Sequence, residues 1–392
     1  MADDRIYDAV IVGAGIVGAT LAAILANASK RVAVVEARQP LQFAAAAEFD
    51  LRVSAINRFS QQTFAAADVW CQMLEKRVQP YDVMHVWDEG GSGEVRFTAE
   101  EIGAPELGHI IENRVIQSSL WELLESHQSV DIFCPCSVKA LALNSKTNVV
   151  ELDNGQRLTA RLVVGADGLA SMVRELSGIN IQREDYGQKG IVATIKTEYD
   201  HQDTAWQRFL SGGPLALLPL NHGYSSIVWS LPGDQADRYL NQSDTDFCRL
   251  LSEASDYKLG GVTELSQRAA FPLMGSQASA YIADGVALIG DAAHTIHPLA
   301  GQGVNLGIKD AVVLSELLLP EHSRDWSSHK LLRRYERARK GENLLAMKVM
   351  EGFKHLFCHD AEVVKLTRNT GLKLFNSMPL AKQRIMRSAM GL

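Results

Sequence analysis

The chain has 392 residues, a formal net charge of −7, and 46% hydrophobic and 22% charged residues. These values exclude an intrinsically disordered chain and predict a soluble globular protein with two or more structural units. Positive charge is concentrated at the end, where residues 331–392 contain thirteen Lys/Arg and five Asp/Glu. Nothing else in the sequence favours a nucleic-acid partner, and we expect none. Five scattered cysteines indicate free thiols in a reducing cytoplasm.

The first apolar stretch, from Ala9 to Ala26, is long enough to raise the question of a membrane span. Asp3, Asp4 and Asp8 precede or begin it, unlike the basic start of a signal peptide. A strand, a turn and a helix buried in a Rossmann-like unit look equally apolar. We therefore predict such a unit here and not a transmembrane segment.

A dinucleotide-binding motif occupies this unit. The β-rich run Tyr7 to Val12 leads into Gly13-Ala14-Gly15-Ile16-Val17-Gly18 and a helical pattern, and a second strand ends at Glu36. In such a motif the first glycine makes a tight turn, the second admits a pyrophosphate and the third packs helix on strand. The acid can bind ribose hydroxyls and would repel a 2′-phosphate. The strand, helix and acid together make the motif specific for a dinucleotide other than NADP.

The middle of the chain alternates helices and strands. Residues 51–57, LRVSAIN, carry Arg52, which could reach a phosphate or a bound ring, or could simply be solvated. Val83 to Phe97 resembles a hairpin, and a helix opens near Arg114. Asn154-Gly155 predicts a turn. An apolar strand then ends at a second acidic turn, Asp167-Gly168.

A third acidic turn follows a β-rich stretch. Residues 186–274 read mostly as strands, interrupted by a helix over 244–254. The short apolar run Val286 to Ile289 then turns at Gly290-Asp291. After a loop containing His297-Pro298, Gly301-Gln302-Gly303 precedes a new helix. The glycines and the helix start would offer N–H groups to an anionic ring, and Asp291 could accept bonds from hydroxyls, which together suit a flavin.

The three acidic turns predict one site. Each ends an apolar strand, and in a parallel sheet all three would meet at the same carboxyl edge, where one extended dinucleotide could touch them all. We therefore predict FAD and an α/β fold: a Rossmann-like FAD-binding domain with an inserted β-rich substrate domain and C-terminal helices. The predicted units are the FAD-binding domain at 1–82, 110–185 and 275–330, a substrate-domain hairpin at 83–109, the β-rich substrate domain at 186–274 and the C-terminal helical region at 331–392.

These motifs resemble those of the FAD-dependent aromatic hydroxylases. Within that family the chain is most similar to the ubiquinone-biosynthesis branch, and closest to its 2-octaprenylphenol hydroxylases. Besides the flavin motifs, the similar segments are LRVSAIN, GHIIEN at 108–113, SIVWSL at 226–231, LRRYERARK at 332–340 and the C-terminal GLKL…AMGL. The resemblance implies a monooxygenase that hydroxylates the ring of a polyprenylated phenol through a flavin C4a-hydroperoxide formed with O2.

The resemblance also implies roles for individual residues. Pro298 would line the oxygen-reacting face of the ring, and Arg52 would sit near the flavin. The residue types of His294 and His297 favour an acid–base role, or they could only shape the loop; His297 is the catalytic candidate of the two. The residues implied in holding FAD are Gly13, Gly15, Gly18, Glu36, Arg52, Arg114, Asp167, Gly290, Asp291, Gly301, Gln302 and Gly303. The candidates for the prenyl-phenol pocket are Phe209, Leu217, Leu218, Trp229 and Leu299, of which the first four could instead be core of the inserted sheet.

Several alternatives stay open at this stage. The enzyme could be a sister hydroxylase acting at another ring position, a flavin-dependent isoprenoid reductase or a non-catalytic FAD-binding scaffold. His294 and His297 lack a third ligand nearby in the sequence, so we expect no metal. No separate nicotinamide-binding fold is evident, which leaves NADPH and NADH open as electron donors.

The C-terminal region also admits two interpretations. Its excess of basic residues suits an anionic membrane surface, which would make the cytoplasmic protein peripheral on the inner face of a membrane. The other interpretation is that these helices pack on the FAD-binding domain with solvated charges. Other ubiquinone-biosynthesis proteins are further expected partners. The apolar residues that favour lipid contact are Val363, Val364, Leu366, Leu372, Leu374 and Phe375.

Overall fold

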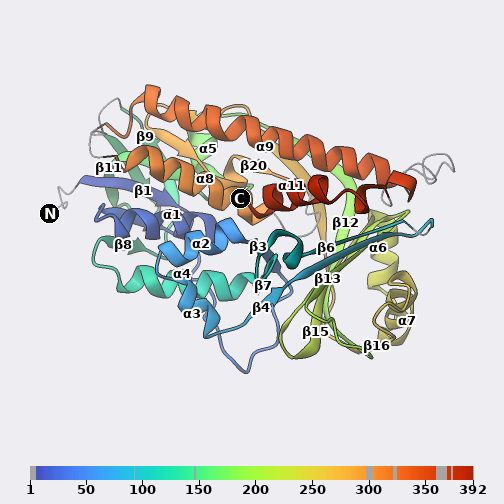
Figure 1. The fold of residues 1–392 in the computed structure, drawn as a ribbon. Helices are drawn as coiled ribbons and strands as arrows, with labels where there is room; N and C mark the ends of the chain where they lie inside the picture. The colour runs from blue at the N-terminus through green and yellow to red at the C-terminus, as the bar shows by residue number, and fades with distance from the viewer. Residues whose placement is uncertain are drawn as a thin grey trace.

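The computed structural model describes residues 6–91, 93–144, 147–296, 303–320, 325–358, 369–371 and 374–391. Two large sheets, of eight and nine strands, form the two ends of an elongated molecule, with a three-stranded sheet near their junction (Figure 1). The long helix α9 (His329–Cys358) runs along one side past both large sheets. The predicted α/β fold class is confirmed.

The first sheet is the Rossmann-like part of the molecule. Its central strands run parallel and are almost completely buried. Helix α1 (Ile16–Asn27) packs on two of them, and α4 (Asn113–Ser126) and α8 (Gly303–Leu318) pack against α1. The strand order is β18 (Ile282–Ala283), β19 (Val286–Leu288), β11 (Arg157–Gly165), β1 (Ile6–Val12), β2 (Val32–Val35) and β8 (Val130–Phe133). An antiparallel branch adds β10 (Asn148–Leu152) and β9 (Val138–Ala142) to β11.

The second sheet is mainly antiparallel and is built largely from the middle of the chain. One face packs on the helices α6 (Gly233–Leu240) and α7 (Asp244–Ala254). The strand order is β20 (His294–Thr295), β17 (Ala269–Ala278), β12 (Ile181–Thr197), β15 (Tyr224–Pro232), β14 (Gly213–Pro219), β13 (Thr204–Leu210), β5 (Val83–Asp88) and β6 (Glu94–Thr98), with β16 (Val262–Leu265) beside β12.

The small sheet connects the two large ones. In spatial order it consists of β3 (Val53–Asn57), β7 (Gly108–Glu112) and β4 (Val78–Tyr81). Two helices, α2 (Arg58–Ala66) and α3 (Trp70–Leu74), lie between β3 and β4 in the sequence. Apolar side chains of β3 and β7 share a core with the face of the second sheet that α6 and α7 leave uncovered. The two large units are thus joined by hydrophobic packing as well as by the chain.

Several local predictions are confirmed. The predicted hairpin is β5 and β6, the helix over 244–254 is α7, and the turn at Asn154-Gly155 joins β10 to β11. The second sheet extends beyond the predicted range 186–274, because β12 begins at Ile181 and β17 ends at Ala278. The domain boundaries remain predictions.

The C-terminal helix α11 (Pro379–Met390) packs against the substrate-side hairpin. Met386 and Met390 are buried beside the one-turn helix η1 (Ala99–Ile102), and Lys382 Nζ lies 2.6 Å from Glu101 Oε1. Next to Met390, Ala389 O accepts a hydrogen bond from Asn57 Nδ2 at 3.1 Å. Among the helices that the structure describes, none is sufficiently long and apolar to cross a membrane.

Candidate functional site

The three acidic turns converge at one edge of the first sheet. Parallel register places Val12 beside both Gly165 and Val35, and Gly165 beside Leu288. Backbone bonds continue past the strand ends: Ala166 N donates to Val12 O at 2.8 Å, and Ile289 N donates to Gly165 O at 3.0 Å. The convergence predicted from the sequence is therefore present in the fold.

The glycines of the first turn divide into two kinds. A Cβ on Gly13 would lie 2.4 Å from Ala166 O, and a Cβ on Gly18 would lie 2.0 Å from Gly13 O. Gly13 also has a φ of +100°, which disfavours any side chain. By contrast, a Cβ on Gly15 would meet no protein atom within 4 Å. The first and third glycines are thus required by protein packing, while the second borders open space.

The open space at Gly15 has the properties of an anion site. Gly15 is the N-cap of α1 and no side chain caps the helix there, so its first N–H groups are available to a ligand. Beside it, Glu36 Oε2 accepts from Ala14 N at 2.7 Å, which holds the acid against the turn. The arrangement suits a pyrophosphate at the helix start and a ribose at the acid.

Asp167, in the second turn, has one carboxylate oxygen in use and one buried and unpaired. Val173 N donates to Oδ2 at 3.1 Å, whereas Oδ1 is buried with no hydrogen-bond partner in the described part of the chain. Burial raises the pKa of this carboxyl. An unpaired buried oxygen of this kind is costly unless a ligand supplies a donor.

Arg174 joins the second turn to the third, although it was not among the predicted site residues. Its side chain is buried, and it donates to Leu169 O at 2.7 Å and to Ala292 O at 2.9 Å. A basic residue six positions beyond Gly168 was visible in the sequence, but its distant acceptor, Ala292 O, was not.

Asp291, in the third turn, has a carboxyl that reaches solvent but is largely surrounded by protein. Its side chain reaches solvent, yet so much protein surrounds it that burial raises the pKa of its carboxyl, against the opposing effects of His294 and Arg52. The charge of Arg52 acts on Asp291, so the structure brings these two predicted site residues together.

These features fit FAD. The sheet edge offers uncapped N–H groups for the pyrophosphate, Glu36 for a ribose, and two carboxyls, Asp167 and Asp291, whose oxygens are not all used by protein donors. Hydroxyls of the cofactor are the donors that such oxygens lack. The individual binding roles remain predictions.

Arg114 has a different set of partners from those expected. Its guanidinium donates to Glu48 O at 2.6 Å and reaches Glu112 Oε2 at 3.4 Å, and Arg77 Nε lies 2.8 Å from Glu112 Oε1. Arg77 also lies over the ring of Phe49 at 4.6 Å. These contacts hold the loop before β3 against the start of α4. Arg114 would contact FAD in addition to these partners.

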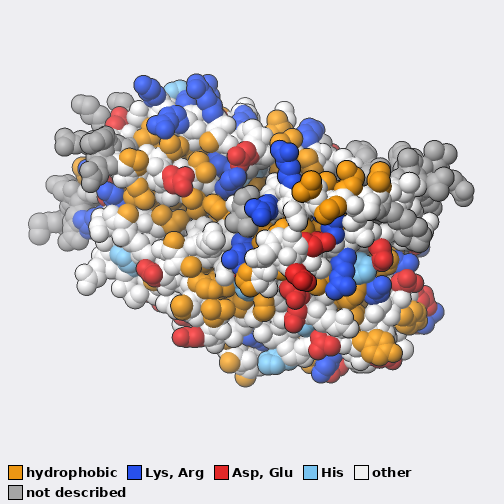
Figure 2. Space-filling view, viewed as in Figure 1, with side chains coloured by type: hydrophobic (Ala, Val, Ile, Leu, Met, Phe, Trp, Pro, Cys, Tyr) orange, Lys and Arg blue, Asp and Glu red, His pale blue; other side chains and the backbone are white. Residues whose placement is uncertain are grey.

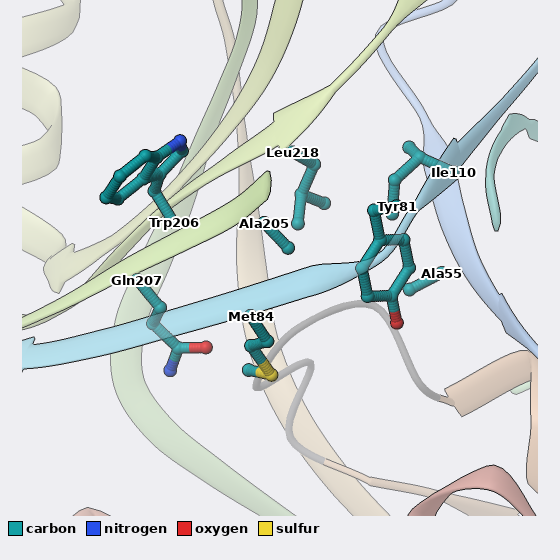
Figure 3. A pocket seen from close by; sticks show the side chains of 8 residues that line it. All are labelled: Ala55, Tyr81, Met84, Ile110, Ala205, Trp206, Gln207 and Leu218. Atoms are coloured by element: carbon teal, nitrogen blue, oxygen red, sulfur yellow. The ribbon is translucent and has the colours of Figure 1, made fainter. Parts of the chain in front are cut away.

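An apolar pocket lies between the small sheet and the second sheet (Figure 3). Its polar groups are the hydroxyl of Tyr81 and the amide of Gln207; burial raises the pKa of Tyr81 to about 12, so that its hydroxyl stays protonated at neutral pH. The residues that line the pocket are Ala55, Tyr81, Met84, Ile110, Ala205, Trp206, Gln207 and Leu218.

The predicted substrate residues lie in two places. Phe209 packs with Val86 and Met84, and Met84 also lines the pocket. Leu217 and Trp229 lie instead in the core between the second sheet and α7, which is the alternative role considered for them. Leu218, the next residue along β14, lines the pocket because successive side chains of a strand point to opposite faces.

Part of the predicted site lies outside the described residues. This holds for His297, Pro298, Leu299, Gly301 and Gln302, whose roles remain predictions. Gly303 is described and begins α8.

His294 is buried, with Nε2 2.6 Å from Asp310 Oδ2. Within the ranges given above, no three His, Cys, Asp or Glu side chains are grouped as a metal site would require.

Comparisons with known proteins agree with this geometry. A family model described as FAD binding domain matches residues 6–350. A 3-demethoxyubiquinol 3-hydroxylase from Escherichia coli is 36% identical over 387 residues, covering 97% of this chain and 98% of the relative. A ubiquinone hydroxylase from Rhodospirillum rubrum is 34% identical over 390 residues, covering 99% and 90%. A solved structure of a probable FAD-dependent monooxygenase from Pseudomonas aeruginosa has a TM-score of 0.78 at 24% identity, covering 94% of this chain and all of the other, which indicates a shared fold.

Proposed function

Because the chain belongs to the FAD binding domain family and is a FAD-dependent aromatic monooxygenase, we propose that it hydroxylates the ring of a polyprenylated phenol in ubiquinone biosynthesis. The observation that carries the proposal is the near-complete alignment with two relatives named as hydroxylases of ubiquinone or its demethoxy precursor. The apolar pocket supports it, since an isoprenoid-bearing phenol needs a dry, hydrophobic lining with few polar groups.

The chain's own residues would bind and orient the reactants. When bound, FAD would pass two electrons from a reduced donor to O2 and so supply the oxygen activation that the side chains lack. The open space at Gly15, the acid Glu36 and the carboxyl of Asp291 would hold the cofactor along the sheet edge. Apolar side chains such as Met84 and Leu218 would keep water from the ring, and Gln207 could orient a phenol hydroxyl.

The ring position is part of the proposal. The resemblance to 2-octaprenylphenol hydroxylases favours an octaprenylphenol as substrate, whereas the relative from Escherichia coli is named as a 3-demethoxyubiquinol 3-hydroxylase. Turnover of both compounds under identical conditions, with NADH and NADPH in parallel, would assign the position and the donor.

Isotope labelling tests the reaction class. With 18O2 and a prenylphenol, the product should carry one labelled hydroxyl on the ring, because the inserted oxygen comes from O2. Label that enters only from H2 18O would contradict the hydroxylase. A product with altered tail saturation and no new oxygen would favour the isoprenoid reductase, and tight FAD binding without turnover would favour the non-catalytic scaffold.

We also propose that the C-terminal helices contact an anionic membrane surface, from which a prenylated substrate would be taken. Hydrophobic and basic side chains lie close together over α11 (Figure 2). Leu380 is 81% exposed and Ile385 53% exposed, and Arg384 and Arg387 are exposed on the same helix. A surface of this composition matches anionic lipid heads above an apolar layer.

Some described residues support the other interpretation, in which the C-terminal helices pack on the protein. Phe375 lies 6.2 Å from the ring of Phe97, and α11 packs on η1, so part of this region packs on the protein. Leu374 is 61% exposed, while Val363, Val364, Leu366 and Leu372 lie outside the described residues.

Liposome flotation at low salt distinguishes the two interpretations. The native protein should float with anionic vesicles and not with neutral ones, and a Leu380→Ser/Ile385→Ser variant should float less. No lipid-dependent flotation of the native protein at low salt would leave packing as the only role. Flotation with purified ubiquinone-biosynthesis proteins present would test whether a protein partner replaces the lipid.

A further inference from the structure

A buried polar cluster lies directly behind the third acidic turn. At its centre is Asp310 of α8, which is completely buried. Its Oδ2 accepts from Gly290 N at 3.0 Å and lies 2.6 Å from His294 Nε2, while its Oδ1 accepts from Arg339 Nε at 2.7 Å and from Asn343 Nδ2 at 3.2 Å. One carboxylate therefore links the turn, the short strand β20, α8 and α9.

The charges of this cluster are mutually compensating. Burial alone would raise the pKa of Asp310, but the nearby His294 and Arg339 outweigh it and lower the pKa below its usual value. The carboxyl is therefore ionised at physiological pH. A buried anion persists only when donors occupy its lone pairs in good geometry, so the cluster permits little displacement of the groups around it.

Helix α9 holds the backbone on both sides of the turn. Tyr335 OH donates to Leu288 O, at the end of β19, at 2.7 Å. Arg339 also reaches Leu306 O, in the first turn of α8, at 3.4 Å. From the opposite side, Asn305 Nδ2 donates to Ala55 O of β3 at 2.7 Å. The strand before the turn and the helix after it are thus both fixed from outside the sheet edge.

We propose that Arg339 is a positioning residue for FAD: acting through Asp310, it holds the third turn and the start of α8 where Asp291 and the first N–H groups of that helix meet the cofactor. The proposal rests on the FAD site described above. It also gives a role to the LRRYERARK segment, which lies at a distance from the glycine motifs in the sequence. Arg339 itself is fully buried and reaches the site only through other groups.

Two variants and a control test the proposal. Arg339→Lys keeps the charge but loses the planar fork that joins Asp310, Asn343 and Leu306. The double variant Asp310→Leu/Arg339→Met removes both charges, so that no unpaired ion is left buried. Lys382→Met is the matched control, because Lys382 is also a buried cation in an ion pair, but on α11 beside η1.

The measurements are the FAD dissociation constant of the apoprotein, the visible circular dichroism of bound flavin and the melting temperature. Arg339→Lys should weaken FAD binding by about tenfold and change the flavin spectrum. If the Asp310→Leu/Arg339→Met variant folds, its FAD binding should also be weaker and its flavin spectrum changed. Lys382→Met should lower the melting temperature while FAD affinity stays within about twofold of native, as expected for sites without shared partners.

Native FAD affinity and spectrum in Arg339→Lys would overturn the proposal, whether or not the double variant folds. So would an equal loss of FAD affinity in Lys382→Met at the same loss of melting temperature, because the effect would then reflect general instability. Failure of the FAD site itself is recognised separately: Asp291→Ala would then leave FAD affinity unchanged.

Discussion

The two sides of the third turn differ in how their carboxyls are satisfied. On the ligand side, Asp291 reaches solvent, and burial raises the pKa of its carboxyl. On the other side, Asp310 is fully buried with four polar partners, and its pKa is lowered. Two aspartates within twenty residues of one another thus have opposite environments. The difference teaches that polar groups held ready for a ligand are those that the protein leaves incompletely paired.

The glycines of the first turn show the same division. Gly18 is closed by the protein, since a Cβ there would lie 2.0 Å from Gly13 O. Gly15 faces open space. A motif that reads as one unit in the sequence therefore contains one residue required by packing and one required by the cofactor.

The largest expected effect comes from changing these two glycines separately. Gly18→Ala should prevent stable folding, or cost more than about 3 kcal/mol, because the nearest atom is backbone and cannot move aside. Gly15→Ala should leave the melting temperature of the apoprotein unchanged while weakening FAD binding. Urea unfolding and FAD titration measure the two properties independently. Equal stability loss in both variants would contradict the division between packing and ligand space.

The next effect separates the two aspartates. Asp310→Ala leaves Arg339 without its carboxylate and should destabilise the protein by about 3–5 kcal/mol. Asp291→Ala should instead weaken FAD binding by about 1–3 kcal/mol, through the loss of a hydroxyl acceptor, with little change in apoprotein stability. Calorimetry of apo and FAD-bound forms provides both quantities. If Asp291→Ala destabilised the apoprotein as much as Asp310→Ala does, the ligand side and the buried side of the third turn would contribute equally to stability, which would contradict the comparison.

The smallest expected effect concerns pH. Because the pKa of Asp291 is raised, the folded protein binds a proton at this carboxyl more tightly than the unfolded chain does. The carboxyl therefore favours folding at low pH, and this contribution to stability is lost as the pH rises through the raised pKa. Asp291→Asn should therefore raise the apoprotein melting temperature at pH 7–8, on the order of 1–2 °C. The difference should disappear below about pH 4, where the native carboxyl is protonated in both states. A gain that is independent of pH would indicate a different cause.

The sequence was informative wherever the chemistry of the site is local. A glycine and an acid directly after an apolar strand predict their own position at the carboxyl edge, so Gly13, Glu36, Asp167 and Asp291 could be placed before the fold was known. The partnership of Asp310 with Arg339 could not, because it depends on how α8 packs against α9.

The pocket lining was harder to predict for a different reason. Leu217 and Leu218 are both apolar members of one strand, and only the register of β14 against its neighbours decides which of them faces the small sheet. Residues 297–302, which carry the catalytic predictions at His297 and Pro298, lie outside the described part of the chain.

The order of strands in the first sheet has a consequence for biosynthesis. The sheet edge that would hold FAD is built from β1, β11 and β19. Its last strand, β19, is synthesised after every strand of the second sheet except β20. Until then, the side of β11 that pairs with β19 presents unpaired backbone groups to other nascent chains. If Arg339 acts through Asp310 as proposed, the FAD site is complete only when α8 and α9 are in place, because they carry these two residues. The FAD site is therefore assembled from elements of which the last, β19, α8 and α9, follow the inserted strands β12–β17 in the chain.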